Sequence, residues 1–252
     1  MGFCTGVFCR NYCGGCCEFL QHRLCEKRLG FFSRALFRRA KRGGGCCKIR
    51  TVAELEHAFA EAESDFIARR GFPKEVLFFA NKSKRILSVY GRAGGKEKFE
   101  HLKDYPFTGF SGKLGPKLKS GDRQIPEGIY GIEYLNPNST FHLSLKVSYP
   151  GDFDVKKALA DGRKPEELGG DIMIHGRSGT VGCIPIGDDA VEEVFIIAAK
   201  AGIHNIKVII SPCNLLSCER NFAKDVGVQW YGELIENIRS EMLKYKALGV
   251  VF

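Results

Sequence analysis

The stretch from residue 171 to residue 187, DIMIHGRSGTVGCIPIG, constrains the fold of this chain more than any other. Its short apolar run at 172–174 predicts a strand that ends at His175 and Gly176. A loop of small and polar residues follows, and Cys183 comes eight residues after the histidine. The chain must therefore return a cysteine towards the strand that carries the histidine.

A cysteine in this position has two interpretations. It is a core residue, because cysteine is among the most often buried residue types, or it is a nucleophile activated by a nearby base. Gly182 favours the second interpretation, because a residue without Cβ lets backbone approach Cys183 and leaves amide N–H groups facing a developing oxyanion. A helix predicted over 188–201 would add the positive end of its dipole, weakened by Asp188 and Asp189.

Three further motifs precede this stretch: SGKLGPKL at 111–118, GDRQIPEGIY at 121–130 and NPNSTFHLSL at 136–145. Together with the His-Gly and Gly-Cys pairs, they resemble the L,D-transpeptidase catalytic domain (YkuD) family, most closely its shorter-loop YafK-like branch. The resemblance covers about residues 75–211. It departs from the commoner family pattern at Val181, which stands where that pattern has a histidine, and at Pro185 and Ile186 after the cysteine.

The resemblance implies an α+β fold, a mixed β-sandwich core with packed helices. It implies a cysteine acyltransferase that acts on peptidoglycan stem peptides through a thioester, with Cys183 as nucleophile and His175 as general base. The backbone N–H groups of Gly182 and Cys183 would form the oxyanion hole, and the backbone carbonyl of Thr180 would orient His175. An amine acceptor would make the enzyme a transpeptidase, and water would make it an L,D-endopeptidase.

The loop at 111–121 is rich in glycine and lysine. It is either a solvated turn or one wall of a substrate groove, in which Lys117 or Lys113 would meet a peptide carboxylate. His142, which is otherwise a surface residue, and Gly176 lie within the family-like motifs and are candidate substrate contacts. No cofactor is implied. The expected location is the bacterial cell envelope or periplasm, with a role in cell-wall biogenesis and cell shape.

A non-enzymatic alternative remains from the residues alone. With His175 and Cys183, Cys213 and Cys218 would make a Cys₃His zinc set in a binding domain, although the CxxxxC spacing is looser than in most zinc knuckles. Cys213 and Cys218 are otherwise a disulfide, if the domain is exported, or two unpaired thiols.

Composition separates residues 1–50 from the remainder. They hold eleven Lys/Arg against two Asp/Glu and eight of the eleven cysteines, which accounts for the whole net charge of +9. Residues 51–252 are neutral, so the basic charge does not indicate a nucleic-acid-binding domain. We expect 1–50 to be a poorly ordered, Cys-rich basic extension and 51–252 to be the catalytic domain. A metal site at Cys13 and Cys16 is an alternative.

No targeting or membrane segment is visible in the sequence. Charged or polar residues interrupt every apolar run near the start, which excludes a recognisable signal peptide. No run of about 20 apolar residues predicts a transmembrane helix. Gly6 stands where an N-myristoylation motif needs a hydroxyl residue.

Periodicity and turn residues predict the secondary structure of residues 51–252. Helices are expected from Thr51, with a capping box, to Gly71, over 152–160, over 188–201 with an aspartate cap, and over 230–245. Strands are expected at 76–80, 86–90, 105–110, 129–135, 141–149, 172–174 and 206–210.

Overall fold

The computed structural model describes residues 36–39, 48–51, 71–218 and 226–252. The chain divides into two units, Met1–Arg34 and Ala35–Phe252, and the first lies wholly outside the described residues. Strands β1 (Leu36–Arg39) and β2 (Lys48–Thr51) pair antiparallel. Thr51 therefore ends a strand, and the predicted helix after it and the Cys13–Cys16 site lie outside the described residues.

A five-stranded mixed sheet forms one half of the domain. Its strand order is β5-β4-β3-β11-β6. The strands are β3 (Glu75–Asn81), β4 (Ile86–Arg92), β5 (Glu100–Pro106), β6 (Gly128–Tyr130) and β11 (Ile206–Ser211). The central strands β3 and β11 run parallel and are apolar along most of their length, because both of their faces are covered.

A four-stranded sheet carries the histidine and leads to the cysteine. Its order is β10-β9-β8-β7, with only β10 and β9 parallel. The strands are β7 (Ile132–Asn136), β8 (Ser144–Val147), β9 (Met173–His175) and β10 (Ile184–Pro185). The chain passes from the first sheet to this one at Gly131.

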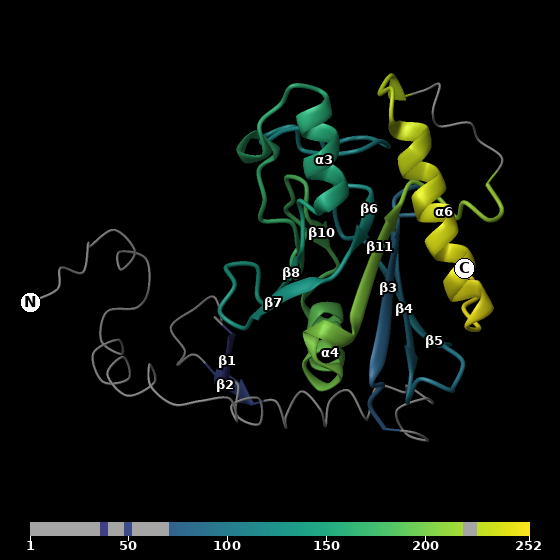
Figure 1. Ribbon diagram of the computed structural model, residues 1–252. Coiled ribbons are helices and arrows are strands. Elements are labelled where there is room, and N and C mark those ends of the chain that lie inside the picture. The colour runs from purple at the N-terminus through teal and green to yellow at the C-terminus, as the bar shows by residue number, and fades with distance from the viewer. Residues whose placement is uncertain (1–35, 40–47, 52–70, 219–225) are drawn as a thin grey trace, which may run out of the picture. The chain divides into compact units, whose positions relative to one another are not determined.

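Helices complete two apolar clusters. The main core joins both sheets to helix α4 (Asp188–Ala201), which has the predicted bounds. Its stripe of Val191, Val194, Phe195 and Ala198 is buried. Helix α6 (Tyr231–Ala247) covers the other face of the five-stranded sheet and lies beside β11 and β3 in Figure 1. Helix α3 (Asp152–Ala160) and the short 3₁₀ helices η2 (Pro165–Leu168) and η3 (Ile203–Asn205) connect strands. The predicted α+β fold is confirmed.

Three predicted strands differ from the structure. The strand predicted at 105–110 is β5, which ends at Pro106, because Phe107 and Phe110 leave the sheet to pack against the core. The strand predicted at 129–135 is two strands, since Gly131 donates its N–H to Ser148 Oγ where the chain changes sheets. The strand predicted at 141–149 shrinks to β8 and is buried on both faces.

The start of α4 also differs from the prediction. Gly187, with φ +86°, is the N-cap residue, and no side chain caps the helix. The Asp188 carboxylate, expected to cap the helix, instead accepts the backbone N–H of Arg177 at 2.8 Å. The first turn of α4 is thereby tied to the loop that leads to Cys183.

Candidate active site

Cys183 lies immediately before β10, next to β9. Ile184 pairs with Ile174 in the parallel register, so Cys183 stands opposite Met173. The Met173 N–H donates to Sγ at 3.4 Å, and the thiol donates to the Asp171 carbonyl oxygen at 3.3 Å. The residue is partly exposed rather than sealed in the core. Part of this residue therefore faces solvent.

His175 shares the face of the sheet on which Cys183 lies. Ile174 points into the core, so Met173 and His175, two residues apart, point to the opposite face. The register makes His175 a diagonal neighbour of Cys183 across the parallel pair of β9 and β10. Among residues 71–218, however, no hydrogen bond joins the imidazole to the thiol.

The imidazole of His175 is enclosed. The residue is only 1% exposed. The ring of Phe141, itself 40% exposed, lies with its centroid 4.5 Å from the imidazole. Phe141 covers the ring because β8 starts only at Ser144, which leaves Phe141 outside the sheet.

The hydrogen bonding of His175 defines its tautomer. Nδ1 lies 2.5 Å from the Gly176 carbonyl oxygen, which can only accept, so Nδ1 carries the proton. Nε2 then keeps its lone pair. Burial lowers the pKa of His175. The hydrogen bond to the Gly176 carbonyl raises it, but this effect is smaller than that of burial. The neutral, Nδ1-protonated imidazole is the form that can act as a base.

The thiol of Cys183 is protonated at rest. Burial raises its pKa, and the carboxylate of Asp171 adds to the shift. The Met173 N–H and the ammonium of Lys117 oppose it. A neutral thiol near a neutral imidazole requires proton transfer during attack rather than a preformed thiolate.

The carbonyl oxygen that orients His175 is that of Gly176, which corrects the expectation that Thr180 supplies it. Thr180 instead holds the backbone of Cys183 in place. Its hydroxyl accepts the Cys183 N–H at 2.9 Å and donates to the Cys183 carbonyl oxygen at 2.7 Å. The Gly182 N–H donates to Ser111 Oγ at 2.7 Å. Both amides predicted to face an oxyanion are therefore already bonded, which corrects the expectation that they are free.

Gly182 is needed for close approach. Its φ is +100°, and a Cβ there would lie 2.9 Å from the Gln124 carbonyl oxygen. The loop that contains Ser111 and Gln124 thus forms one wall beside the thiol. The sequence indicated this wall only as a glycine- and lysine-rich loop, and it did not single out Ser111 or Gln124.

Lys117 is enclosed in that wall. Its side chain is 6% exposed, and Nζ pairs with Asp122 at 2.6 Å and donates to the Lys119 carbonyl oxygen. Asp122 also accepts three backbone N–H groups, which together with Lys117 hold its pKa below the usual range despite burial. The charge of Lys117 is thus already compensated. Lys113 is exposed.

His142 and Gly176 lie beside Phe141. His142 Nε2 lies 2.7 Å from Glu192 Oε1 on α4, and the His142 backbone has φ +77°. A Cβ on Gly176 would lie 2.6 Å from Asp188 Oδ1 and 2.7 Å from the Phe141 carbonyl oxygen. Both residues therefore contact protein groups that hold Phe141 in place.

The proposed zinc ligands lie in different parts of the domain. Cys213 and Cys218 belong to the cluster under α6, whereas His175 is on the four-stranded sheet. All three described cysteines are free thiols. Within the described part of the chain, no group of three or more His, Cys, Asp or Glu residues is arranged to hold a metal.

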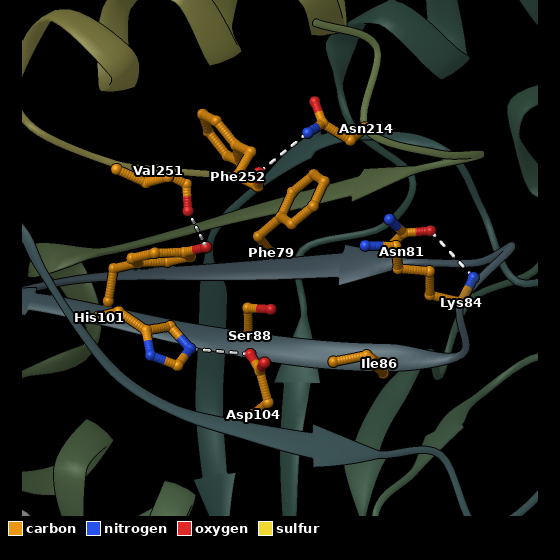
Figure 2. Close-up of a pocket in the computed structure, with 11 residues that line it drawn as sticks. Phe79, Asn81, Lys84, Ile86, Ser88, His101, Asp104, Asn214, Val251 and Phe252 are labelled. Atoms are coloured by element: carbon orange, nitrogen blue, oxygen red, sulfur yellow. Dashed lines mark hydrogen bonds and ion pairs between the residues drawn. The ribbon is translucent and has the colours of Figure 1, made fainter. Parts of the chain in front are cut away.

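Two cavities lie outside this constellation. One of about 460 Å³ is lined by the 112–124 loop, Val226 and Val228. The other, about 340 Å³, contains His101, Asp104 and Ser88 (Figure 2). There Asp104 bonds both His101, at 2.9 Å, and Ser88, so the carboxylate stands between hydroxyl and imidazole. This order does not make a nucleophilic triad, in which the histidine bonds the hydroxyl.

Comparisons with known proteins concern part of the chain. No family model matches it. The curated protein "Putative L,D-transpeptidase YafK" of Escherichia coli strain K12 is 30% identical over 147 residues, which are 56% of this chain and 55% of that protein. The same values hold for the protein of that name in strain O157:H7. The chain thus spans about half the length of the curated relatives that it matches.

Solved structures show more distant similarity. The helical cell shape determining protein Pgp2 from Campylobacter jejuni has a TM-score of 0.43 and 21% identity, over 65% of this chain and 57% of that one. Mycobacterium tuberculosis L,D-transpeptidase 1 has a TM-score of 0.33 and 14% identity, over 54% and 62%.

None of the described helices is both long enough and apolar enough to cross a bilayer.

The motifs, the α+β fold and the 147-residue match agree with one another. The predicted resemblance is confirmed: over 147 residues this chain is similar to a curated putative L,D-transpeptidase of the YafK type.

Proposed function

We propose that this chain is a cysteine-dependent L,D-transpeptidase that acts on peptidoglycan stem peptides through a thioester. The observation that carries the proposal is the partly exposed Cys183 thiol on the same face of the sheet as His175. The name of the curated relatives, putative L,D-transpeptidase, supports the choice of reaction. It also supports a location in the cell envelope.

The first half of the reaction forms the thioester. His175 Nε2 takes the thiol proton as Sγ attacks the carbonyl carbon of an L-residue bonded to a D-residue. The tetrahedral oxyanion collapses and the C–N bond breaks. The leaving amine of the D-residue takes the proton back from the imidazole. The Nδ1–H bond to Gly176 holds the ring in the tautomer that this step needs.

The second half of the reaction resolves the thioester. An acceptor amine attacks the thioester carbonyl, His175 accepts its proton, and the Cys183 thiol is released. Water in place of the amine gives the endopeptidase reaction on the same site. Because Phe141 covers His175 at rest, the proposal assigns His142 and Gly176 to positioning Phe141 rather than to substrate contact.

The test compares the wild type with Cys183→Ala on purified stem tetrapeptides. We expect the wild-type protein to gain the mass of the tripeptide acyl group and to release the terminal D-residue, and Cys183→Ala to do neither. Cys218→Ala, which removes another partly exposed thiol, is the matched control and keeps both activities. Adding a second stem peptide as amine acceptor then separates transpeptidation from hydrolysis.

Two results would overturn the proposal. One is release of the D-residue by Cys183→Ala at the wild-type rate, because the thiol would then take no part. The other is a wild-type protein that neither gains the acyl mass nor releases the D-residue from stem tetrapeptides, because the thiol would then not react with this substrate.

A further inference from the structure

The segment from Thr108 to Ser111 runs beside the loop that leads to Cys183. Thr108 Oγ1 donates to the Arg177 carbonyl oxygen at 2.5 Å, and Ser111 Oγ accepts the Gly182 N–H at 2.7 Å. Between them, Gly109 passes so close that a Cβ would lie 2.1 Å from the Ser178 carbonyl oxygen. This contact holds Ser111 next to the residue that precedes the thiol.

The hydroxyl of Ser111 has an unused proton. A serine hydroxyl has one O–H to donate and two lone pairs to accept with. Among the described residues, Ser111 Oγ accepts from Gly182 and donates to nothing. The hydroxyl of Thr180 differs because it both accepts from and donates to Cys183. Of these two described hydroxyls, the one on Ser111 keeps a donor for a ligand.

The oxyanion of the proposed reaction needs such a donor. The Cys183 N–H is bonded to Thr180 and the Gly182 N–H to Ser111, so neither amide is open. Charge supplies little in their place, since Asp171 and Lys117 act on the thiol in opposite directions and Lys117 is paired with Asp122.

We propose that Ser111 is a further catalytic residue, whose hydroxyl donates to the oxyanion of the tetrahedral intermediate. The Gly182 N–H donates to Oγ and polarises the O–H, so the amide and the hydroxyl act in series as N–H···O–H···O⁻. This arrangement uses the resting hydrogen bonds and requires no rearrangement of the loop. The inference rests on the proposed function, because it assigns a role within that reaction.

The test measures two reactions of Cys183 that differ in one respect. Acylation by a stem tetrapeptide passes through an oxyanion, whereas alkylation by iodoacetamide does not. We expect Ser111→Ala to slow acylation about 10²- to 10³-fold, as loss of an oxyanion donor does elsewhere, and to leave alkylation within about twofold. Ser111→Thr, which keeps the hydroxyl, should restore most of the acylation rate. Peptide mapping follows Cys183 apart from the other cysteines.

Thr108→Val is the matched control. It removes a hydroxyl that fastens the same loop at Arg177, away from the thiol, and should leave acylation within a few-fold. Equal losses of acylation and alkylation in Ser111→Ala would mean a structural role and overturn the inference. Unchanged acylation in Ser111→Ala would also overturn it while the proposed function stands. If the wild type is not acylated, the proposed function fails first, and this inference with it.

Discussion

Two buried polar clusters of this domain differ in how fully their groups are hydrogen-bonded. The Lys82 ammonium donates to the carbonyl oxygens of Gly115 and Ile125, each at 2.9 Å, and to Glu127 at 2.7 Å. Glu127 also accepts from the Gly115 N–H and from the Tyr231 hydroxyl. At the other cluster, the imidazole of His175 has one backbone partner and the thiol of Cys183 has two.

The difference separates a structural cluster from a reactive one. Lys82 and Glu127 are both fully buried, and every proton of the ammonium has an acceptor, so the pair joins β3, the 115–127 loop and α6. His175 keeps an unpaired Nε2 instead. A buried polar group without its full set of partners lowers the stability of the fold. The unpaired Nε2 of His175 lies where the proposed reaction needs a lone pair.

The largest expected effect comes from breaking the structural cluster. Lys82→Met leaves the Glu127 carboxylate buried without a cation, which should lower the free energy of unfolding by about 3–5 kcal/mol. Urea unfolding followed by circular dichroism measures it. Because Glu127 also holds Gly115, the loop that carries Ser111 and Gln124 should lose order, and acylation of Cys183 should fall with it.

Lys84→Met is the control, since that exposed lysine lies two residues on and should change stability by less than about 0.5 kcal/mol. The double variant Lys82→Met/Glu127→Leu should recover part of the loss, because it removes both charges. A Lys82→Met protein as stable as the wild type would show that the comparison between the two clusters is wrong.

Asp154 gives a smaller effect with a defined pH dependence. This buried carboxylate accepts from the Gly151 N–H at 2.9 Å and the Tyr130 hydroxyl at 3.4 Å, and burial raises its pKa to about 6. The folded state therefore binds the proton more tightly than the unfolded chain. Its contribution to stability is present below pH about 4 and is lost as the pH rises through about 6, by up to about 2–3 kcal/mol.

Asp154→Asn should remove this pH dependence while keeping one acceptor oxygen. Urea midpoints at pH 4.5 and 7.5 measure the change, and Asp152→Asn, an exposed aspartate in the same first turn of α3, should behave as the wild type. If the wild type and Asp154→Asn lose stability equally between the two pH values, Asp154 is ionised in the folded protein without penalty.

Much of the fold could be predicted because local patterns and burial agree. Helices α3 and α4 both have the predicted bounds. The errors arose where tertiary contacts override the pattern. Nothing in the local sequence around Gly131 indicates the end of a strand, yet the chain changes sheets there. The change occurs because β6 pairs with β11 and β7 pairs with β8, in different sheets.

The candidate site was predicted in its residues but not in its contacts. The spacing of His175 and Cys183 indicated a loop that returns the cysteine towards the histidine strand, and the register agrees with that. The short strand β10 after Cys183 was not predicted. No local signal could show that Phe141 would cover the imidazole, because its position depends on where β8 begins. Ser111 was hidden for the same reason, since its contact with Gly182 joins residues 71 positions apart.

The smallest expected effect concerns the pH profile of acylation. The base is neutral imidazole, so the rate should fall as the pH falls through the pKa of His175. Burial lowers that pKa, which places the fall below the ordinary histidine value of about 6.5. Phe141→Ala should expose the ring to water and move the fall upward, towards the ordinary value, because less desolvation opposes the charged form. Phe107→Ala, which removes a ring packed on the core rather than on His175, should leave the position of the fall unchanged. A profile that stays in place in Phe141→Ala would mean that the other groups around His175 keep it desolvated, and that Phe141 is not its cover.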